Sequence, residues 1–264
     1  MTTSKTQKKQ VIISMTSFPK AITYAVQAIR SLLNGSVLPD KLVLYLNLWQ
    51  FPNREVPECL VSLERESPIF EVHDYKGDIR SYCKLIPALK DFPEAVIVTV
   101  DDDVDYDRHM LRDLLALHAR VPGAVIAHRV RKIKVGRPYR NWPRYHFHDF
   151  LLKRIHKGFL NLQTGVGGVL YPPHSLKQEM MDADLFTRLA PSTDDIWFWA
   201  AATANGTPVI PVPFGQNRPR DLHKPREISL RVKNFKGVED RNLQALTTIL
   251  EHFPELKEQI KRKP

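Results

Sequence analysis

The chain has 264 residues, 43% of them hydrophobic, and its 39 Lys and Arg outnumber its 29 Asp and Glu to give a net charge of +10. This length suits one large domain or two small ones, and the apolar content excludes a disordered protein. No apolar run reaches the roughly 20 residues of a membrane-spanning helix, no secretory signal opens the chain, and Cys59 and Cys83 form no paired motif, so we expect a reducing, cytoplasmic location.

The first half of the sequence alternates between β-rich runs and segments of helical periodicity. We expect strands at 11–13, 42–46, 70–72 and 95–100, and helices at 21–33, 55–66, 84–90 and 107–118. The nearly continuous β-branched run at 95–100 is typical of a strand that is covered on both faces of a parallel sheet. Four strand–helix units predict a doubly wound α/β fold, whose ligands bind beyond the carboxyl ends of the strands. The chemistry is therefore expected directly after Val100.

The second half is less regular. We expect a strand at 124–127, a glycine-containing segment at 165–170 that leads through two prolines into a helix, a helix at 194–204, an edge strand at 209–212 and a final helix at 243–253. The stretch from 215 to 236 is polar and basic.

The excess positive charge is concentrated in one segment. Between Arg120 and Lys157 there are eleven Lys and Arg and one acid, Asp149, so this segment alone accounts for the net charge of the chain. Aromatic residues are interleaved with these cations, a combination that attracts nucleic acid, an anionic membrane surface or a phosphorylated substrate. The segment is interpreted as a long functional loop or mobile insertion, and the alternative is a solvated insertion that keeps the protein soluble.

Three adjacent carboxylates, Asp101, Asp102 and Asp103, follow the predicted central strand. Their mutual repulsion at a sheet edge is unfavourable unless a cation or solvent relieves it. In an extended chain, residues i and i+2 project to the same side, so Asp101 and Asp103 are expected to face one site while Asp102 points elsewhere. Hard oxygen ligands without a nearby Cys favour Mg²⁺ or Mn²⁺ over Zn²⁺. An acidic turn that caps the following helix is the simpler alternative.

This acidic triplet resembles the DxD motif of GT-A-fold nucleotide-sugar glycosyltransferases. The likeness covers most of the chain and also rests on the opening segment 13–19, the segment 81–85, the glycine segment 163–173 and the segment 193–197. Together these segments resemble bacterial glycosyltransferases of surface-polysaccharide assembly, such as lipopolysaccharide synthesis. The resemblance implies a GT-A-like fold, with a Rossmann-type, mostly parallel sheet, helices on both faces and an irregular C-terminal acceptor half.

The resemblance also implies roles at the donor side. Asp103 binds the metal, and Asp101 contacts the ribose of the donor or helps to hold the metal. Further donor contacts are implied for the remaining acid of the triplet, for the loop after the first strand and for two residues that touch uracil or phosphate, namely Asp102, Thr16, Ser17, Phe18, Asp78 and Lys84.

A second acidic pair, Asp194 and Asp195, begins the predicted helix that carries Trp197. The resemblance implies that a carboxylate here deprotonates the acceptor hydroxyl, and Asp195 aligns with the last position of the motif. Asp194 stands where the family usually has Glu, so the choice between the two aspartates stays open. A plain helix N-terminus is the alternative for both.

Glycines and a C-terminal basic cluster complete the predicted site. Gly167 and Gly168 belong to neither a Walker loop nor a Rossmann fingerprint, and we interpret them, with Trp197, as acceptor-binding residues that let the backbone approach a sugar. A tight strand entry is the alternative for the glycines. The resemblance implies that His223 reaches the metal and that three cations bind the diphosphate, namely Arg218, Arg220 and Lys224.

The sequence thus predicts a transferase that uses Mn²⁺ or Mg²⁺ to move a sugar from a nucleotide donor, a UDP-sugar in the first instance, to a hydroxyl of a glycan or glycolipid. We divide one compact domain into a basic tail at 1–10, a donor-binding half at 11–123 and an acceptor-binding half at 124–264, and expect a cytoplasmic or peripheral membrane protein. The alternative enzyme is a metal-dependent nuclease or phosphodiesterase. A plain nucleic-acid-binding module is disfavoured by acids at the strand end.

Overall fold

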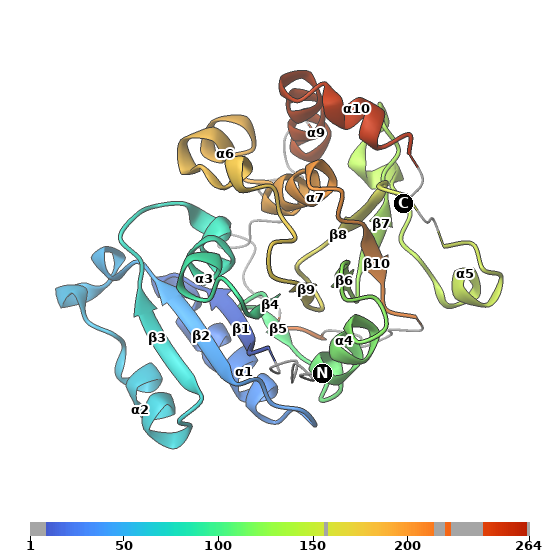
Figure 1. Ribbon diagram of the computed structural model, residues 1–264. Coiled ribbons are helices and arrows are strands. Elements are labelled where there is room, and N and C mark those ends of the chain that lie inside the picture. The colour runs from blue at the N-terminus through green and yellow to red at the C-terminus, as the bar shows by residue number, and fades with distance from the viewer. Residues whose placement is uncertain (1–8, 156–157, 214–219, 223–239, 263–264) are drawn as a thin grey trace, which may run out of the picture.

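A seven-stranded sheet forms the centre of the molecule in the computed structural model, which describes residues 9–155, 158–213, 220–222 and 240–262 (Figure 1). The spatial order of the strands is β10-β6-β9-β4-β1-β2-β3, and every neighbouring pair is parallel except the two pairs that involve β9. In chain order the strands are β1 (Val11–Thr16), β2 (Lys41–Leu46), β3 (Phe70–Asp74), β4 (Val96–Thr99), β6 (Val125–Ala127), β9 (Val169–Tyr171) and β10 (Val209–Pro211). The predicted α/β class with a mostly parallel sheet is confirmed.

Helices cover both faces of this sheet because its strands are apolar on both faces. Side chains of successive strand residues point to opposite faces, and Ile12 and Ile97 accordingly lie in one buried apolar cluster while Ile13 and Val98 lie in the other. The first cluster includes residues of α3 (Ile86–Asp91), α6 (Ala183–Leu189), α7 (Asp194–Ala204), α9 (Arg241–His252) and α10 (Glu255–Gln259). The second includes residues of α1 (Ile22–Leu33), α2 (Glu58–Glu66) and α4 (Met110–His118).

Two small sheets flank the central one. β7 (Val130–Lys132) pairs antiparallel with β8 (Asn161–Gln163), and β5 (Val104–Asp105) pairs antiparallel with β11 (Arg220–Asp221). Between β7 and β8 the chain forms the short helix α5 (Phe147–Leu151), which stands at the periphery of the ribbon, apart from the other helices (Figure 1). Short 3₁₀ turns complete the described chain: η1 (Pro19–Ala21), η2 (Leu48–Gln50), η3 (Pro52–Arg54), η4 (Arg80–Lys84), η5 (Tyr139–Asn141) and η6 (Gln178–Met181).

The basic segment is folded, which corrects its interpretation as a long loop. Trp142 is fully buried, and its indole Nε1 donates to the carbonyl of Arg137 at 2.9 Å. The one acid of the segment, Asp149, is also buried and pairs with Lys132 of β7 at 3.0 Å. These contacts fix the chain between β7 and α5 to the body of the protein.

Several expected helices differ from the structure, and those expected at 55–66 and 107–118 begin only at Glu58 and Met110. The segment 84–90 begins as the 3₁₀ turn η4 and becomes α3 only at Ile86, with Pro87 in the first turn, where the missing N–H is tolerated. No helix directly follows Pro172 and Pro173, and the next helices there are η6 and α6. None of the helices in the described residues has the length and apolar character that crossing a bilayer requires.

Candidate functional site

A buried lysine joins two acidic segments at the carboxyl edge of the central sheet. The Nζ atom of Lys84 lies 2.9 Å from Oδ1 of Asp101, which follows β4, and 2.9 Å from Oδ2 of Asp194, at the start of α7. The lysine side chain is 8% exposed. Burial acts to lower its pKa, but Asp101, Asp194 and Asp195 raise that pKa well above the ordinary value. Lys84 is therefore a fixed cation between carboxylates.

Asp195 is the carboxylate of this cluster with the clearest acid–base character. Burial, followed by the charges of Asp194 and Asp101, raises the pKa of Asp195 to about 7, while Lys84 and a hydrogen bond oppose the rise. That hydrogen bond comes from the backbone N–H of Gly165, which donates to Oδ1 of Asp195 at 3.1 Å. A carboxyl group that titrates near neutral pH is suited to take a proton from a substrate.

Asp194 is held in place rather than poised for chemistry. Its Oδ1 accepts a hydrogen bond from Ser81 Oγ at 2.9 Å, and Oδ2 faces Lys84. Ser81 and Lys84 both lie on η4, so one turn of chain orients Asp194. The structure therefore assigns different surroundings to the two aspartates that the sequence left unresolved.

Gly165 belongs to the glycine segment for which the sequence predicted close backbone approach, but it was not among the predicted acceptor-binding residues, and it is the glycine at the centre of the site. A Cβ atom at this position would lie 2.7 Å from Lys84 Nζ and 2.8 and 3.0 Å from the two carboxylate oxygens of Asp101. Because β9 runs antiparallel to its neighbours, the turn before it lies at the same edge as the ends of the parallel strands. The composition of the glycine segment indicated close backbone approach, but only the topology shows what it approaches.

The two glycines that were predicted to bind the acceptor lie in the same turn. Gly167 and Gly168 have φ values of 103° and 94°, a region that favours glycine. A Cβ atom on Gly168 would also lie 2.8 Å from the Met110 sulfur of α4. Gly168 thus serves the close packing of the turn, which is the tight strand entry considered as its alternative.

Trp197 is a core residue, which corrects its predicted contact with an acceptor. Its side chain is fully buried, and its Nε1 donates to the carbonyl of Met180 at 2.8 Å. The neighbouring Trp199 is equally buried and donates to the carbonyl of Phe159 at 2.7 Å. The helix that begins with two acids is thus anchored by its two tryptophans and presents only its N-terminus to the site.

The acidic turn after β4 is held by contacts from three directions. Ser17 Oγ donates to Asp102 Oδ2 at 2.5 Å, so Asp102 binds the loop after β1. The backbone N–H of Asp101 donates to the hydroxyl of Tyr106 at 2.7 Å. The backbone N–H of Leu222 donates to the carbonyl of Asp103 at 2.9 Å, next to the β5–β11 pair.

The other predicted donor residues lie in the loop after β1 or near Cys83, which Thr16 at the end of β1 contacts. Thr16 Oγ1 donates to the carbonyl of Tyr45 at 2.9 Å, and Thr16 also bonds to the buried thiol of Cys83, whose pKa burial raises to about 12. Asp78 is exposed, and its charge acts on the same thiol. Phe18 is the N-cap of η1 and lies in the loop that also holds Ser17.

The C-terminal cluster is described in part. Arg220 is exposed in β11, opposite Asp105. Arg218, His223 and Lys224 lie outside the described residues. The pairing of β11 with β5 brings residues 220–222 to the acidic turn, the neighbourhood that the resemblance implies for this part of the chain.

An arginine cluster borders the acid site on its other side. Arg129 precedes β7, and its charge interacts with Asp195. Burial lowers the pKa of Arg129, and the nearby charges of Arg144 and Arg131 act in the same direction. Among the described residues, the buried Nε atoms of Arg129 and Arg131 have no hydrogen-bond partner. Sequence composition indicated a basic segment, but not that Arg129 and Arg131 are partly buried or that Arg129 lies near an acid.

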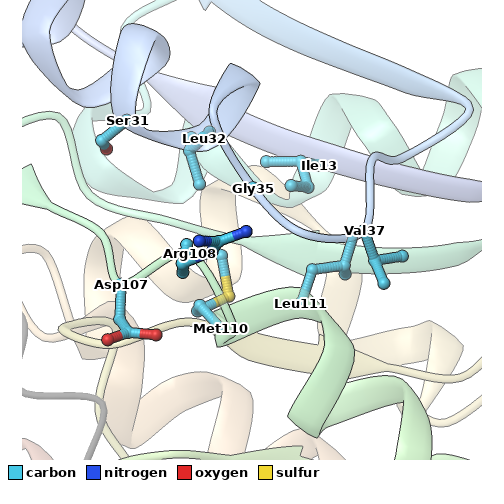
Figure 2. Close-up of a pocket in the computed structure, with 9 residues that line it drawn as sticks. All are labelled: Ile13, Ser31, Leu32, Gly35, Val37, Asp107, Arg108, Met110 and Leu111. Carbon is cyan, nitrogen blue, oxygen red and sulfur yellow. The ribbon is translucent and has the colours of Figure 1, made fainter.

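A small cavity elsewhere in the molecule is too small to bind a substrate. It has a volume of about 10 Å³ and lies between the end of α1 and the start of α4 (Figure 2), with a lining of Ile13, Ser31, Leu32, Gly35, Val37, Asp107, Arg108, Met110 and Leu111. Such a volume accommodates at most about one water molecule. Asp107 Oδ1 accepts from the backbone N–H of His109 at 2.7 Å, but His109 is the N-cap of α4, so Asp107 lies before the helix start rather than at the cap position.

The donors for a divalent cation at the acidic turn are the carboxylates of Asp101 and Asp103. Lys84 takes Oδ1 of Asp101, and the backbone of Gly165 packs closely against both oxygens of that carboxylate. Hard carboxylate oxygens suit Mg²⁺ or Mn²⁺. In the described part of the chain, no three His, Cys, Asp or Glu side chains are grouped as a complete metal site, and the third predicted ligand, His223, lies outside that part.

Neither a protein-family model nor a curated protein sequence matches the chain. Solved structures do resemble it. TarS from S. aureus, residues 1–349, matches with a TM-score of 0.53 at 15% identity, over 94% of this chain and 72% of that one. The mannosyltransferase PcManGT from Pyrobaculum calidifontis, solved with GDP-Man and Mn²⁺, matches with a TM-score of 0.52 at 12% identity, over 96% of this chain and 76% of that one. The chain therefore has a glycosyltransferase fold.

Proposed function

We propose that the protein transfers a sugar from a nucleotide donor to a hydroxyl group of a glycan or glycolipid acceptor. The observation that carries this proposal is the placement of Asp195, with its raised pKa, beside the Lys84-bridged carboxylates at the carboxyl edge of a sheet with a glycosyltransferase fold. Ligands of open α/β sheets bind at this edge. Surface-polysaccharide synthesis is the process in which such a transferase would act.

Asp195 is the proposed general base. In its ionised form it takes the proton of the acceptor hydroxyl while that oxygen forms a bond to the anomeric carbon and the bond to the departing nucleoside diphosphate breaks. The backbone N–H of Gly165 orients one oxygen of Asp195. Lys84 offsets the negative charge of Asp101 and Asp194, so that Asp195 is able to ionise at neutral pH.

Asp101 and Asp103 would hold a divalent cation, and His223 is the third ligand that we propose. When bound, Mn²⁺ or Mg²⁺ supplies positive charge against the diphosphate of the leaving group. The loop at Thr16, Ser17 and Phe18 would lie against the nucleoside. PcManGT was solved with GDP-Man and Mn²⁺, which supports a metal and a nucleotide sugar in general. A UDP-sugar is our first choice of donor.

Residues 124–264 would form the acceptor side of the same domain. Its glycine turn and its arginine cluster both border Asp195. The cations of the cluster suit an acceptor that carries phosphate or carboxylate groups. We propose a cytoplasmic enzyme that works at the inner face of the cell membrane, where glycolipid acceptors are available.

A ligand panel tests the donor proposal. UDP, GDP and CMP, each with and without Mn²⁺, are added to the protein, because a ligand that binds only the folded state raises the melting temperature. We expect one nucleotide to stabilise the protein in a Mn²⁺-dependent manner, and Asp103→Asn to abolish that dependence while the circular dichroism spectrum stays unchanged. A panel without any shift, or wild-type Mn²⁺ dependence in Asp103→Asn, contradicts the proposed donor site.

The nuclease alternative receives no support. The structural neighbours are glycosyltransferases, and two-metal hydrolysis needs two cations about 3.5–4 Å apart within a carboxylate cluster. Here Lys84 stands between Asp101 and Asp194. The carboxylates of the site are thus arranged around a lysine, and no observation favours a nucleic-acid substrate.

A further inference from the structure

We infer that α5 is a membrane-docking element that inserts apolar side chains into an anionic lipid surface. Six large apolar side chains are exposed in the described part of the chain, and three of them lie within residues 147–152. Their exposed fractions are 50% for Phe147, 59% for Leu151 and 56% for Leu152. Three exposed apolar side chains within six residues, at a helix on the periphery of the molecule, indicate an interaction surface (Figure 1).

Cations frame this apolar tip. Lys153 and Arg154 follow directly after Leu152, Arg144 precedes the helix, and all three are exposed. The acid of the segment is turned inward, because Asp149 accepts from the backbone N–H of His146 at 2.8 Å and pairs with Lys132 at 3.0 Å. Although desolvation opposes the change, these contacts lower the pKa of Asp149. The outward face of α5 is thus apolar and cationic, without an exposed carboxylate.

The base of α5 adjoins a basic groove. This groove has a volume of about 440 Å³ and is lined by Lys132, Lys134 and Arg137 together with Ile133, Val135 and Leu160. Lys132 belongs both to this groove and to the ion pair that holds α5. Lipid headgroups with negative charge are attracted to such a surface. This attraction adds to the favourable insertion of the exposed apolar side chains of α5 into the lipid.

The geometry of α5 is fixed before any membrane contact. The His146 side chain and the Asp149 side chain cap the start of the helix, and Lys153, with φ of 52°, ends the run of helical residues. Lys132 also lies over the ring of Tyr145, 4.4 Å from its centroid. The tip is therefore presented as a rigid unit, so that binding does not require this element to fold.

A lipid bilayer suits this surface better than a protein partner does. The exposed apolar side chains are three, on a helix of five residues and its C-cap, whereas a stable protein interface takes roughly 20–30 residues from each partner. A bilayer accepts a small apolar tip because the surrounding cations contact headgroups of opposite charge. The inference deepens the proposed function, since an enzyme docked in this way would meet glycolipid acceptors, but it is tested without any reaction.

Vesicle flotation tests the inference. The full chain is mixed with vesicles of phosphatidylcholine alone, or with anionic vesicles in which roughly 30% of the lipid is phosphatidylglycerol. We expect binding to the anionic vesicles, weaker binding to the neutral ones and release by added salt. The double variant Leu151→Ser/Leu152→Ser should lose binding by roughly tenfold or more, and Lys153→Gln/Arg154→Gln should lower it by a similar factor.

Matched controls separate docking from general surface properties. Leu38→Ser/Trp49→Ser removes two apolar side chains that are 51% and 61% exposed elsewhere, and Lys20→Gln/Lys90→Gln removes two remote exposed cations. Both controls should bind anionic vesicles as the wild type does. Unchanged binding by Leu151→Ser/Leu152→Ser, or no vesicle binding by the wild type, overturns the inference.

Sedimentation equilibrium distinguishes a lipid surface from a second copy of the chain as the partner of α5. A wild-type dimer that becomes monomeric in Leu151→Ser/Leu152→Ser identifies a second copy of the chain as the partner of α5, which also overturns the inference. Nucleotide binding in the thermal-shift panel is independent of α5. Failure of vesicle binding and failure of the proposed transferase are therefore distinguishable.

Discussion

At the scale of single residues, the buried ion pairs of Lys84 dominate the site. Removing one partner of a buried ion pair leaves an uncompensated charge, which is far less favourable than the loss of an exposed pair. Lys84 has two carboxylate partners at 2.9 Å, and the net effect of the group depends on all three remaining together. The lysine therefore has a stabilising role that is separable from any contact with a nucleotide.

Lys84→Met should lower the free energy of unfolding by about 3–5 kcal/mol, because Asp101 and Asp194 would repel each other in a buried place. Urea denaturation measures this change. The control is Lys41→Met, which breaks the half-exposed pair with Glu71 and should lower the free energy of unfolding by no more than about 1 kcal/mol. Equal losses in the two variants would mean that the Lys84 pairs are solvent-screened.

Asp195→Asn should bind nucleotide normally and lose turnover by about 10²–10⁴-fold, because it removes the proposed base without changing the donor side. Turnover is followed as nucleotide release in the presence of acceptor, and binding by thermal shift. Asp194→Asn should instead weaken the Lys84 pairing and reduce stability. If Asp194→Asn loses turnover with full stability while Asp195→Asn stays active, the two roles are exchanged.

The stability of the folded state and the rate of transfer should change in opposite directions with pH. Because the pKa of Asp195 is raised to about 7, the folded state holds this proton more tightly than the unfolded state does, so the contribution of Asp195 to stability falls as the pH rises toward 7. The rate should rise over the same interval because the ionised base is needed. Asp195→Asn should remove both trends, and a rate in the wild type that is constant from pH 5 to pH 8, roughly two units below to one above that pKa, contradicts the assignment.

At the scale of elements, the reversed direction of β9 determines what the site contains. The strand runs against β4 and β6, so its N-terminal turn, rather than its C-terminal end, lies beside Asp101. The backbone of that turn approaches Lys84 and Asp101 so closely that a side chain at Gly165 has no room. The element thus contributes backbone N–H groups where the parallel strands contribute carboxylates.

Gly165→Ala should displace the Lys84–Asp101 pair and lower turnover by about 10²-fold, since small misplacements of catalytic groups have effects of that size. The expected loss of stability is about 1–3 kcal/mol, typical of overpacking. Gly123→Ala is the matched control, because a Cβ there meets nothing within 4 Å. Activity assays and thermal melts of both variants check the prediction, which fails if Gly165→Ala behaves like its control.

The sequence was informative where periodicity was long and poor where elements were short. The helix expected at 194–204 has these bounds in α7, and the continuous β-branched run at 95–100 contains β4. The three-residue strands β6 and β10 were expected because they are largely apolar, whereas β7 and β8, with the sequences VRK and NLQ, carry too little apolar pattern. The burial of Trp142 depends on contacts distant in sequence. The acidic turn could be located because it directly follows the predicted strand at 95–100. The contact between Lys84, Asp194 and Gly165 could not be predicted, because these residues are distant in sequence and only the topology of the sheet brings them together.

At the scale of the whole molecule, charge is separated between two sides of one site. The acidic centre lies at Asp101, Asp194 and Asp195, and Arg129 of the basic segment lies beside it. Not all cations of that segment are available to a partner. Arg131 donates to the carbonyl of Trp142 at 2.6 Å and Lys132 pairs with Asp149, whereas Lys134, Arg137 and Arg140 are exposed.

Replacing Lys134, Arg137 and Arg140 together by Gln should raise the apparent KM for an anionic acceptor and weaken the inhibition of transfer by salt. Exposed cations act mainly through long-range attraction, which is screened over about 10 Å at 0.1 M salt. Hydrolysis of the donor alone should stay unchanged. The control replaces three exposed cations on α3, α6 and α10, Lys90, Arg188 and Lys257, by Gln. Identical salt dependence and KM in both triple variants would leave the segment as a solvated surface only.

The position of β9 between β4 and β6 has a consequence for the order in which the protein forms during synthesis. A nascent chain that has completed β4 carries an open strand edge on its central sheet, a template for unwanted pairing, until residues 169–171 emerge. The same pairing event brings Gly165 against Lys84 and Asp101. Closure of the sheet and the approach of Gly165 to Lys84 and Asp101 are thus one step, and Asp194 and Asp195 of α7 join the site only afterwards. A chain that has not closed its sheet therefore has no assembled site.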